Sequence, residues 1–337
     1  MNVALRILSA GPGSTVQDGG RTGYLRFGVT NAGAMDRLAH ATVNLALANT
    51  LDAAGIEVSM GGIEVVAEGG AVAVACAGGI FDIATEGLKL PETVRLDLVP
   101  GQKLSVRAGA GGAWCYLAVA AEIALPRYLG SLSTHTRSGL GGLEGRMLEA
   151  GDVLALEGAR AIGTSAARVF APWLERPGDV IRVVLGPQDD FFDAGEIARF
   201  AAGPWTISPR SDRMAFRLDG PRIKHARGAD IVSDGIARGA IQVPGDGQPL
   251  AMMADRGSTG GYPKIATVIG PDIGRLSQVR AGAKFRFEIV DVETAVAARR
   301  AEAAALAGPI RAEPVVRREF SSEFLLARNL IDGAVAG

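Results

Sequence analysis

Polar side chains and glycines crowd the entrance to one apolar run of the sequence. Residues 255–278 read DRGSTGGYPKIATVIGPDIGRLSQ, in which the β-branched run 265–269 is typical of a buried strand. Gly260 and Gly261 would let the backbone approach a ligand closely and present N–H groups to it. Such donors would stabilise negative charge on an amide or carboxylate oxygen. The charged, hydroxyl and aromatic groups around the two glycines are Asp255, Arg256, Ser258, Thr259, Tyr262 and Lys264.

The hairpin before this run carries two carboxamides. It reads GAIQVPGDGQPLAMMAD (239–255), with Gln242 and Gln248 on either side of a Pro-Gly-Asp-Gly turn. Turn chemistry by itself accounts for Asp246 and for the glycines. Gln242 is different, because an amide inside an apolar strand costs stability unless both of its ends are hydrogen-bonded.

Three further polar clusters interrupt strand-like segments: STVQDGGRTGYLRFGV (14–29), GSLSTHTRSGLGG (130–142) and SPRSDRMAFRLDG (208–220). Taken singly, their side chains are also typical of turns, helix caps and internal ion pairs. Taken together with the run above, we interpret them as parts of one ligand site. The residues that these clusters add to the site are Gln17, Arg21, Ser133, Thr134, Arg137, Arg210, Ser211 and Arg213.

The composition is that of a glycine-rich globular protein without the excess of basic residues that is typical of nucleic-acid binding. The chain has 337 residues, 46 of them glycine, and a formal net charge of −1. Neither a basic surplus nor a signal-peptide or membrane-spanning pattern is present, so we expect a cytoplasmic protein. Cys76 and Cys115 lie in apolar runs and are interpreted as small buried hydrophobic residues, with a disulfide as the alternative.

Short alternating runs between glycine, proline and aspartate predict a mainly β fold with a few helices. Helices are expected at 34–49, 189–203 and 291–308. We expect two β domains, at residues 1–165 and 178–300, and a linker with a short C-terminal helix at 308–337. A weak similarity between residues 99–123 and 243–273 is consistent with two related barrels, or with chance likeness of glycine-rich hairpins.

Several common kinds of chemistry lack their sequence patterns. There is no P-loop, no Cys-x-x-Cys and no nucleophile elbow. His40, His135 and His225 are far apart and show no metal-ligand spacing. We therefore expect no metal site of the chain's own, although carboxylates could hold Mg²⁺ together with a nucleotide.

The polar clusters resemble the KipA family, also called allophanate hydrolase subunit 2. Its members include the C subunit of ATP-dependent 5-oxoprolinase and part of the carboxyltransferase domain of biotin-dependent urea carboxylase. The resemblance implies cyclophilin-like β-barrels and a partner of the KipI family, which is the B subunit of 5-oxoprolinase. It runs from about residue 5 to 295 and rests on TVQDGGRTGYLRFGVTNAGAMDRLA, GSLSTHTRSGLGG, SPRSDRMAFRLDG and GAIQVPGDGQPLAMMADRGSTGGYPKIATVI.

This chain departs from the family pattern at three places. A Pro-Ser-Gly-Ala-Met-Asp segment is usual where residues 30–36 read TNAGAMD, so the stiffness of the proline is missing. Ser258 stands in place of a usual threonine and keeps the hydroxyl. His135 stands where a tyrosine is common, which would alter contacts to a substrate.

The first function that this resemblance implies is one component of an ATP-dependent 5-oxoprolinase complex that converts 5-oxo-L-proline to L-glutamate. It would act with the B and A subunits of that enzyme, and the complex would use ATP with Mg²⁺. Arg213 or Arg210 would hold the substrate carboxylate or a phosphate. Lys264 would stabilise developing charge, and Asp255 would orient Lys264 or relay a proton. The carboxamides of Gln17, Gln242 and Gln248 would recognise a planar amide.

Two alternatives remain open at the level of sequence. One is the carboxyltransferase component of a biotin-dependent urea or amide carboxylase. Since the chain has no Ala-Met-Lys-Met motif, carboxybiotin would then be carried by another chain. The other is a non-enzymatic KipA-type antagonist of a KipI-like kinase inhibitor.

Overall fold

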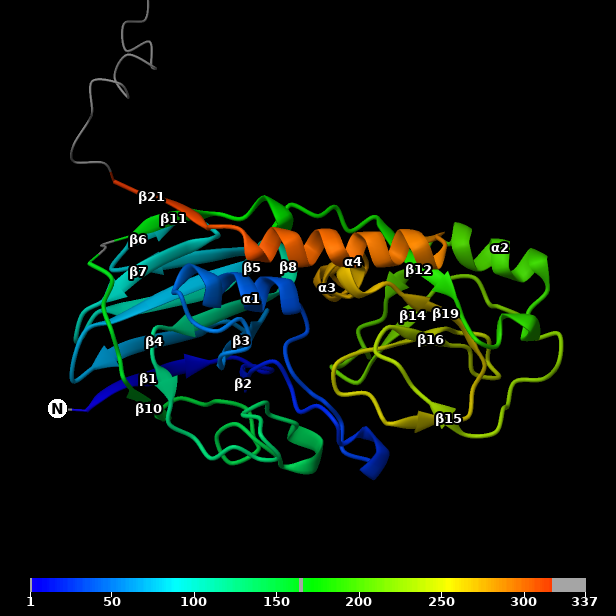
Figure 1. Cartoon of the computed structure of the whole chain (residues 1–337), viewed down its shortest axis with the longest axis horizontal. Coiled ribbons are helices and arrows are strands. Elements are labelled where there is room, and N and C mark those ends of the chain that lie inside the picture. The colour runs from blue at the N-terminus through cyan, green and yellow to red at the C-terminus, as the bar shows by residue number, and fades with distance from the viewer. Residues whose placement is uncertain (1, 164–165, 317–337) are drawn as a thin grey trace, which may run out of the picture.

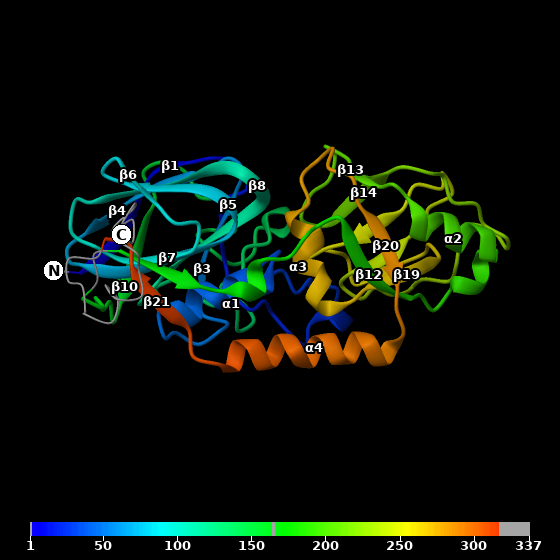
Figure 2. The same cartoon turned by 90° about the horizontal axis from the view of Figure 1, so that it is seen from above.

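A computed structural model describes residues 2–163 and 166–316 of the chain. The fold is mainly β, as the sequence predicts, and its strands form two lobes side by side (Figure 1). A long helix, α4 (Val292–Ala307), lies along both lobes on one side of the molecule (Figures 1 and 2).

The first lobe contains a curled 12-stranded sheet. Its strands are β1 (Val3–Ala10), β2 (Thr15–Gln17), β3 (Gly55–Ser59), β4 (Ile63–Glu68), β5 (Val72–Thr85), β6 (Leu88–Leu90), β7 (Val94–Leu98), β8 (Lys103–Val119), β9 (Glu122–Ile123), β10 (Val153–Glu157), β11 (Ala167–Phe170) and β21 (Arg311–Pro314). The main path runs β21-β11-β7-β5-β8-β4-β1-β10-β9, while β6 pairs with β5 and β3 pairs with both β2 and β8.

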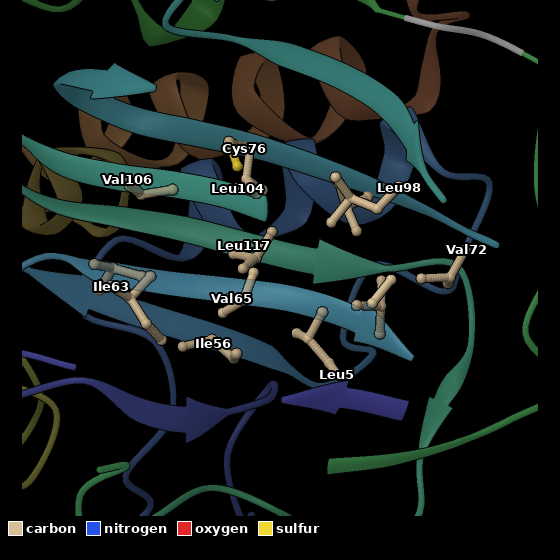
Figure 3. Close-up of a cluster of buried hydrophobic side chains, with 14 of the residues drawn as sticks. Leu5, Ile56, Ile63, Val65, Val72, Cys76, Leu98, Leu104, Val106 and Leu117 are labelled. Carbon is tan, nitrogen blue, oxygen red and sulfur yellow. The ribbon is translucent and has the colours of Figure 1, made fainter. Parts of the chain in front are cut away.

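Alternation along these strands builds the first core. In β1, Leu5 and Ile7 are buried, while Arg6 between them points outward and donates to Glu68 at 2.6 Å. The inward side chains of β3, β4, β5 and β8 meet between the curled faces of the sheet (Figure 3). Cys76 and Cys115 are both free and buried there, which confirms the interpretation that they are small hydrophobic residues.

The second lobe contains a seven-stranded sheet and a two-stranded ribbon. The sheet runs in the order β13-β14-β17-β16-β19-β12-β20, and only its β12–β20 pair is parallel among the described residues. Its strands are β12 (Val180–Leu185), β13 (Thr206–Ile207), β14 (Ala215–Asp219), β16 (Ala240–Gln242), β17 (Leu250–Met252), β19 (Lys264–Val268) and β20 (Arg286–Ile289), and the ribbon pairs β15 (Asp234–Gly235) with β18 (Thr259–Gly260).

Two of the expected helices begin at capping aspartates. Asp36 accepts a hydrogen bond from the Ala39 backbone at 3.2 Å and caps α1 (Arg37–Ala46). Asp291 accepts one from the Thr294 backbone at 2.7 Å and caps α4.

The helix expected at 189–203 is divided. A single 3₁₀ turn, η4 (Asp189–Phe191), ends where Phe192 is extended, and α2 (Ala194–Ala202) follows. Further 3₁₀ turns are η1 (Leu25–Phe27), η2 (Thr136–Ser138) and η3 (Pro172–Leu174).

A fourth helix, α3 (Gly270–Gln278), was not expected. Pro271 lies in its first turn, where a proline is tolerated because that backbone N–H has no partner within the helix. Leu276 is buried in the second core and holds the helix there.

The segment after Gly308 is another correction. We expected an extended linker, but residues 311–314 form β21, which adds an edge strand to the first sheet by pairing with β11. The predicted C-terminal helix lies outside the described residues. The domain boundaries at 165 and 178 stay predictions. Among the described residues, no helix combines the length and the apolar character that crossing a membrane requires.

Candidate functional site

Arg213 connects the two lobes. From the loop before β14, its Nη1 donates to Oε1 of Glu57 on β3, and its Nη2 donates to the carbonyl of Gly33 at 2.8 Å. Nε and Nη2 also donate to the two carboxylate oxygens of Asp255, at 2.9 and 3.0 Å. All three guanidinium nitrogens are therefore engaged within the chain. Internal ion pairs, one of the two roles that the sequence left open for this region, are what the structure shows.

The carboxylate of Glu57 is fully buried and has further donors on its other oxygen. Oε2 accepts from the Met35 backbone at 2.6 Å and from the Tyr116 hydroxyl at 2.7 Å. Burial alone would lower the pKa of Arg213, but the charges of Glu57 and Asp255 outweigh burial and raise this pKa. The guanidinium is therefore charged, and the junction is a largely buried ionic network.

Hydrogen bonds to Asp18 connect the segment at 130–142 with the segment at 14–29. Its Oδ1 accepts from the hydroxyls of Ser131, at 2.6 Å, and Ser133, and its Oδ2 accepts from the Leu132 backbone at 2.6 Å. Burial would raise the pKa of Asp18, but these hydrogen bonds lower it. Oδ1 of Asp18 also accepts from the Gly20 backbone at 2.8 Å, as the side chain of a turn aspartate does.

Arg21 is 1% exposed and keeps one donor free. Its Nη2 donates to the Ser133 carbonyl, whereas its Nη1 has no hydrogen-bond partner among the described residues. Burial lowers the pKa of Arg21, opposed by the charges of Asp18 and Asp255. A buried cationic donor without a partner is costly unless a ligand or water completes it.

His135 lies near the charged groups of Arg21, Arg213 and Asp255. It is 8% exposed, and its Nδ1 has no hydrogen-bond partner among the described residues. Burial lowers its pKa, Asp255 opposes this, and Arg21 and Arg213 add to it. The imidazole is therefore neutral at pH 7 and has one unused ring nitrogen.

Two glycines make room for this group. A Cβ at Gly141 would lie 2.1 Å from the Ser133 carbonyl oxygen and 2.7 Å from Nη2 of Arg21. A Cβ at Gly142 would lie 2.0 Å from Oγ1 of Thr134. The glycine-rich stretch at 139–142 thus lets the backbone lie directly on the buried arginine.

Gln17 and Thr134 are structural. The amide of Gln17 donates to Oγ1 of Thr15 at 2.9 Å and to the Thr134 carbonyl at 3.0 Å, and its oxygen accepts from the Gly33 backbone at 3.1 Å. The Thr134 hydroxyl donates to the Val16 carbonyl at 2.9 Å. Because both ends of the carboxamide are occupied, Gln17 does not offer an amide to a ligand.

Lys264 lies in a second cluster, which we call the ribbon cluster (Lys264, Asp234, Gln188, Gln242 and Gly260). Its Nζ donates to Oδ2 of Asp234 at 2.8 Å, and its backbone N–H donates to Oε1 of Gln188 at 3.2 Å. The Lys264 side chain is 4% exposed, while that of Asp234 is 53% exposed. The ammonium is therefore buried against a carboxylate that faces solvent.

Gln242 and Gly260 complete the ribbon cluster. Gln242 is buried and donates to the Tyr262 carbonyl at 3.4 Å. A Cβ at Gly260 would lie 2.6 Å from Nε2 of Gln242. The glycine therefore permits a close approach as predicted, but what it approaches is the side chain of Gln242.

The other predicted residues of the 208–220 cluster are peripheral. Ser211 accepts from the Arg217 backbone at 3.0 Å, and Arg210 is exposed. Arg137 bridges to this loop, with Nη1 at 3.2 Å from Sδ of Met214.

Four further predicted residues are partly or fully exposed. Ser258 is partly exposed, and Thr259 and Tyr262 are exposed. Gln248 donates to the Gly220 carbonyl at 3.4 Å.

The predicted site residues thus separate into two groups. We call the first the junction cluster (Arg21, Glu57, His135, Arg213 and Asp255). No hydrogen bond or ion pair between described residues joins it to the ribbon cluster. The expectation that Asp255 orients Lys264 is wrong, because Asp255 pairs with Arg213 and Lys264 pairs with Asp234.

Sequence reasoning missed Glu57, Tyr116 and Asp234. Glu57 lies in the run GIEVSMG (55–61), where an acid between apolar strand residues is the one available signal of a buried carboxylate. Tyr116 and Asp234 carry no such signal, because their roles depend on partners far away in the sequence.

Comparisons with known proteins agree with this architecture. The pattern of the carboxyltransferase domain, subdomain A and B, matches residues 27–289. The C subunit of 5-oxoprolinase from Escherichia coli (strain K12) is 35% identical over 303 residues, covering 88% of this chain and 94% of that protein. The urea amidolyase of Saccharomyces cerevisiae is 29% identical over 310 residues, which are 86% of this chain but 17% of that protein.

A solved structure shows the same fold. The crystal structure of the K. lactis urea amidolyase matches with a TM-score of 0.84 and 26% identity, over 95% of this chain and 20% of that chain. The chain belongs to the carboxyltransferase domain family, subdomains A and B. This agrees with the family that the polar motifs resemble.

Proposed function

We propose that this chain is the C-type subunit of an ATP-dependent 5-oxoprolinase complex that converts 5-oxo-L-proline to L-glutamate. The observation that carries the proposal is the 35% identity to the C subunit of 5-oxoprolinase over 94% of that protein's length. A KipI-like B subunit and an A subunit complete the proposed complex, and the complex works in the cytoplasm.

The junction cluster supplies the chemistry that opening a lactam requires. The carbonyl oxygen of 5-oxoproline gains negative charge when the ring amide is attacked, and a donor fixed in a dry site stabilises that charge. Among the described residues of this cluster, Nη1 of Arg21 and Nδ1 of His135 are the buried nitrogens without partners. In the proposal they contact the substrate, and Arg137 at the rim receives its carboxylate.

Arg213 acts as a positioning residue in this proposal. Each of its nitrogens already donates to Glu57, Asp255 or the Gly33 carbonyl, so it has no free edge for a carboxylate or a phosphate. In contrast to the role expected from the sequence, Arg213 therefore does not contact the substrate or a nucleotide in this proposal. ATP with Mg²⁺ is assigned to the complex, where it supplies the free energy for lactam cleavage.

The second candidate is a carboxyltransferase component that acts on urea or a related amide. It is favoured by the structural likeness to the K. lactis urea amidolyase, with a TM-score of 0.84. Carboxybiotin carried by another chain would supply the carboxyl group. The same unpartnered donors would then contact the oxygen of the acceptor amide.

Reconstitution distinguishes the two candidates. The chain is purified together with the B and A subunits of its own organism, and ATP-dependent release of glutamate from 5-oxoproline is measured. The proposal predicts turnover that needs all three subunits. A folded three-subunit complex without this turnover overturns the proposal, and urea-dependent decarboxylation of added carboxybiotin would favour the second candidate.

A further inference from the structure

A small cavity lies between the starts of α1 and α3 and the side of α4. Its volume is about 150 Å³. We call it the arginine cavity, because four arginines and two acids line it: Arg37, Arg176, Arg238, Arg299, Asp36 and Glu302. The arginines of this cavity donate neither to Glu57 nor to Asp255, although Arg238 and Glu57 both bind the backbone of Met35.

Both acids of the arginine cavity are already used. Asp36 caps α1 through Oδ1, and its Oδ2 accepts from Arg176 at 2.6 Å and from Gln278 at 3.1 Å. Glu302 pairs with Arg299, one helical turn away on α4. Among the described residues, no carboxylate forms an ion pair with Arg238. The cavity therefore has an excess of positive charge.

Four guanidinium nitrogens here are closed to solvent and have no hydrogen-bond partner within the described part of the chain. They are Nε and Nη1 of Arg176 and Nε and Nη1 of Arg238. Nη2 of Arg238 donates to the carbonyls of Ala34 and Met35, at 2.7 and 2.8 Å, which fixes the guanidinium against the start of α1. Leaving charged donors dry and unpaired costs free energy that an anion in the cavity would recover.

Other features of the arginine cavity favour negative charge. Burial, followed by the charge of Arg37, lowers the pKa of Arg238 to about 9, which is the response of a cation that lacks a counter-charge. The N-terminus of α3 at Gly270 borders the cavity, and no side chain caps it. A Cβ at Gly274 would lie within 2.9 Å of Nη1 of Arg176 and closer still, at 2.4 Å, to Oδ1 of Asp36, so the glycine leaves room for both groups.

We propose that the arginine cavity binds one small oxyanion of the size of inorganic phosphate. Arg176 and Arg238 each provide two unpartnered guanidinium nitrogens, and charged N–H donors form strong hydrogen bonds to the oxygens of such an anion. The anion would link α1 of the first lobe with Arg238 and α3 of the second. Binding therefore holds the two lobes together, whether or not the chain has the proposed enzymatic function.

The test is phosphate-dependent stability of the full chain at constant ionic strength. Phosphate replaces chloride in steps while the melting temperature is recorded, and equilibrium dialysis with labelled phosphate gives the stoichiometry. We expect the melting temperature to rise by several degrees and one phosphate to bind per chain. Equal melting in chloride and phosphate, with no phosphate retained on dialysis, overturns the proposal.

Variants assign the effect to the cavity. Arg238→Met and Arg176→Met each weaken phosphate binding by about ten- to hundredfold, because each removes charged donors. Arg217→Met is the matched control, since Arg217 is an exposed arginine of the second lobe. Because Arg238 also holds two carbonyls, the phosphate-induced increment is compared and not the baseline. An increment that Arg176→Met and Arg238→Met leave intact overturns the assignment. If neither variant folds, Arg238→Lys keeps the charge but removes the unpartnered Nε and Nη1 donors, and must still bind phosphate more weakly.

Discussion

The guanidinium of Arg213 and the carboxylate of Glu57 form an ion pair across the boundary between the two lobes. The two residues are 156 positions apart in the chain. Glu57 is fully buried, and the Arg213 side chain is 13% exposed. Such a pair is expensive to break from one side, because the remaining charge stays buried without a partner.

Breaking this pair from one side provides the first prediction. Arg213→Met leaves Glu57 and Asp255 uncompensated, so we expect it to lower the free energy of unfolding by about 3–5 kcal/mol. Glu57→Gln alone also destabilises, but the double variant loses less than the sum of the two, which urea unfolding measures. Arg217→Met, at an exposed site, is the control. Additive losses would show that the two residues are not coupled.

Gly260 and Gly261 provide a matched pair for the second prediction. A Cβ at position 260 would lie 2.6 Å from Nε2 of Gln242 and 2.7 Å from Cδ1 of Ile236, whereas at position 261 the nearest atom is 3.5 Å away. We expect Gly260→Ala to destabilise the second lobe by about 1–3 kcal/mol. Gly261→Ala should melt within a degree or two of wild type. Equal stability of the two variants in calorimetry would show that the contact with Gln242 does not restrict the side chain at position 260.

The third prediction decides which cluster contacts the substrate. In the reconstituted complex, Arg21→Lys removes the unpartnered Nη1, and we expect kcat/KM for 5-oxoproline to fall about 10²–10³-fold. Lys264→Met removes the ammonium that pairs with Asp234, and we expect a loss of less than about tenfold. Circular dichroism checks that both variants are folded. The reverse order of effects would place catalysis at the ribbon cluster.

His40 gives the fourth prediction, on pH dependence. This residue is fully buried beside Tyr116, and burial lowers its pKa below the ordinary value of 6.5. The unfolded chain therefore binds a proton at a higher pH than the folded chain does. The free energy of unfolding should fall as the pH drops below about 6.5 toward the folded-state pKa.

A variant isolates this contribution. His40→Asn cannot titrate, so its stability should change less between pH 7 and pH 5 than that of wild type, measured by urea unfolding at each pH. The comparison is between slopes, since the substitution also changes the packing against Tyr116. Parallel slopes for wild type and variant would contradict the prediction.

Local pattern was sufficient for most strands and for the start of α4. Alternating side chains indicate β1 and the capping Asp291 indicates where α4 begins, whereas the helix expected from residue 34 begins at Arg37. The helix α3 was missed, because its GPDIG start is typical of a turn. Packing of Leu276 in the second core outweighs that preference.

The candidate site could be predicted by residue type but not by pairing. The sequence identified Arg21, Arg213 and Asp255 as polar groups that a core alone does not need. The sequence also predicted that Asp255 orients Lys264, whereas in the structure Lys264 forms an ion pair with Asp234 of the ribbon. Asp255 follows β17 and Lys264 begins β19, with the ribbon strand β18 between them, so proximity along the chain is a poor guide to contact here.

The order of residues by itself therefore determined the β-rich class, most strand positions, the start of α4 and the family. Only the tertiary structure decided that Glu57 pairs with Arg213, that Arg21 and His135 each keep a nitrogen without a partner, and that Arg176 and Arg238 line one cavity. The physical reason is the distance along the chain over which each interaction acts. Backbone conformation responds to near neighbours, while the partner of a buried charge is selected by how whole sheets and helices pack.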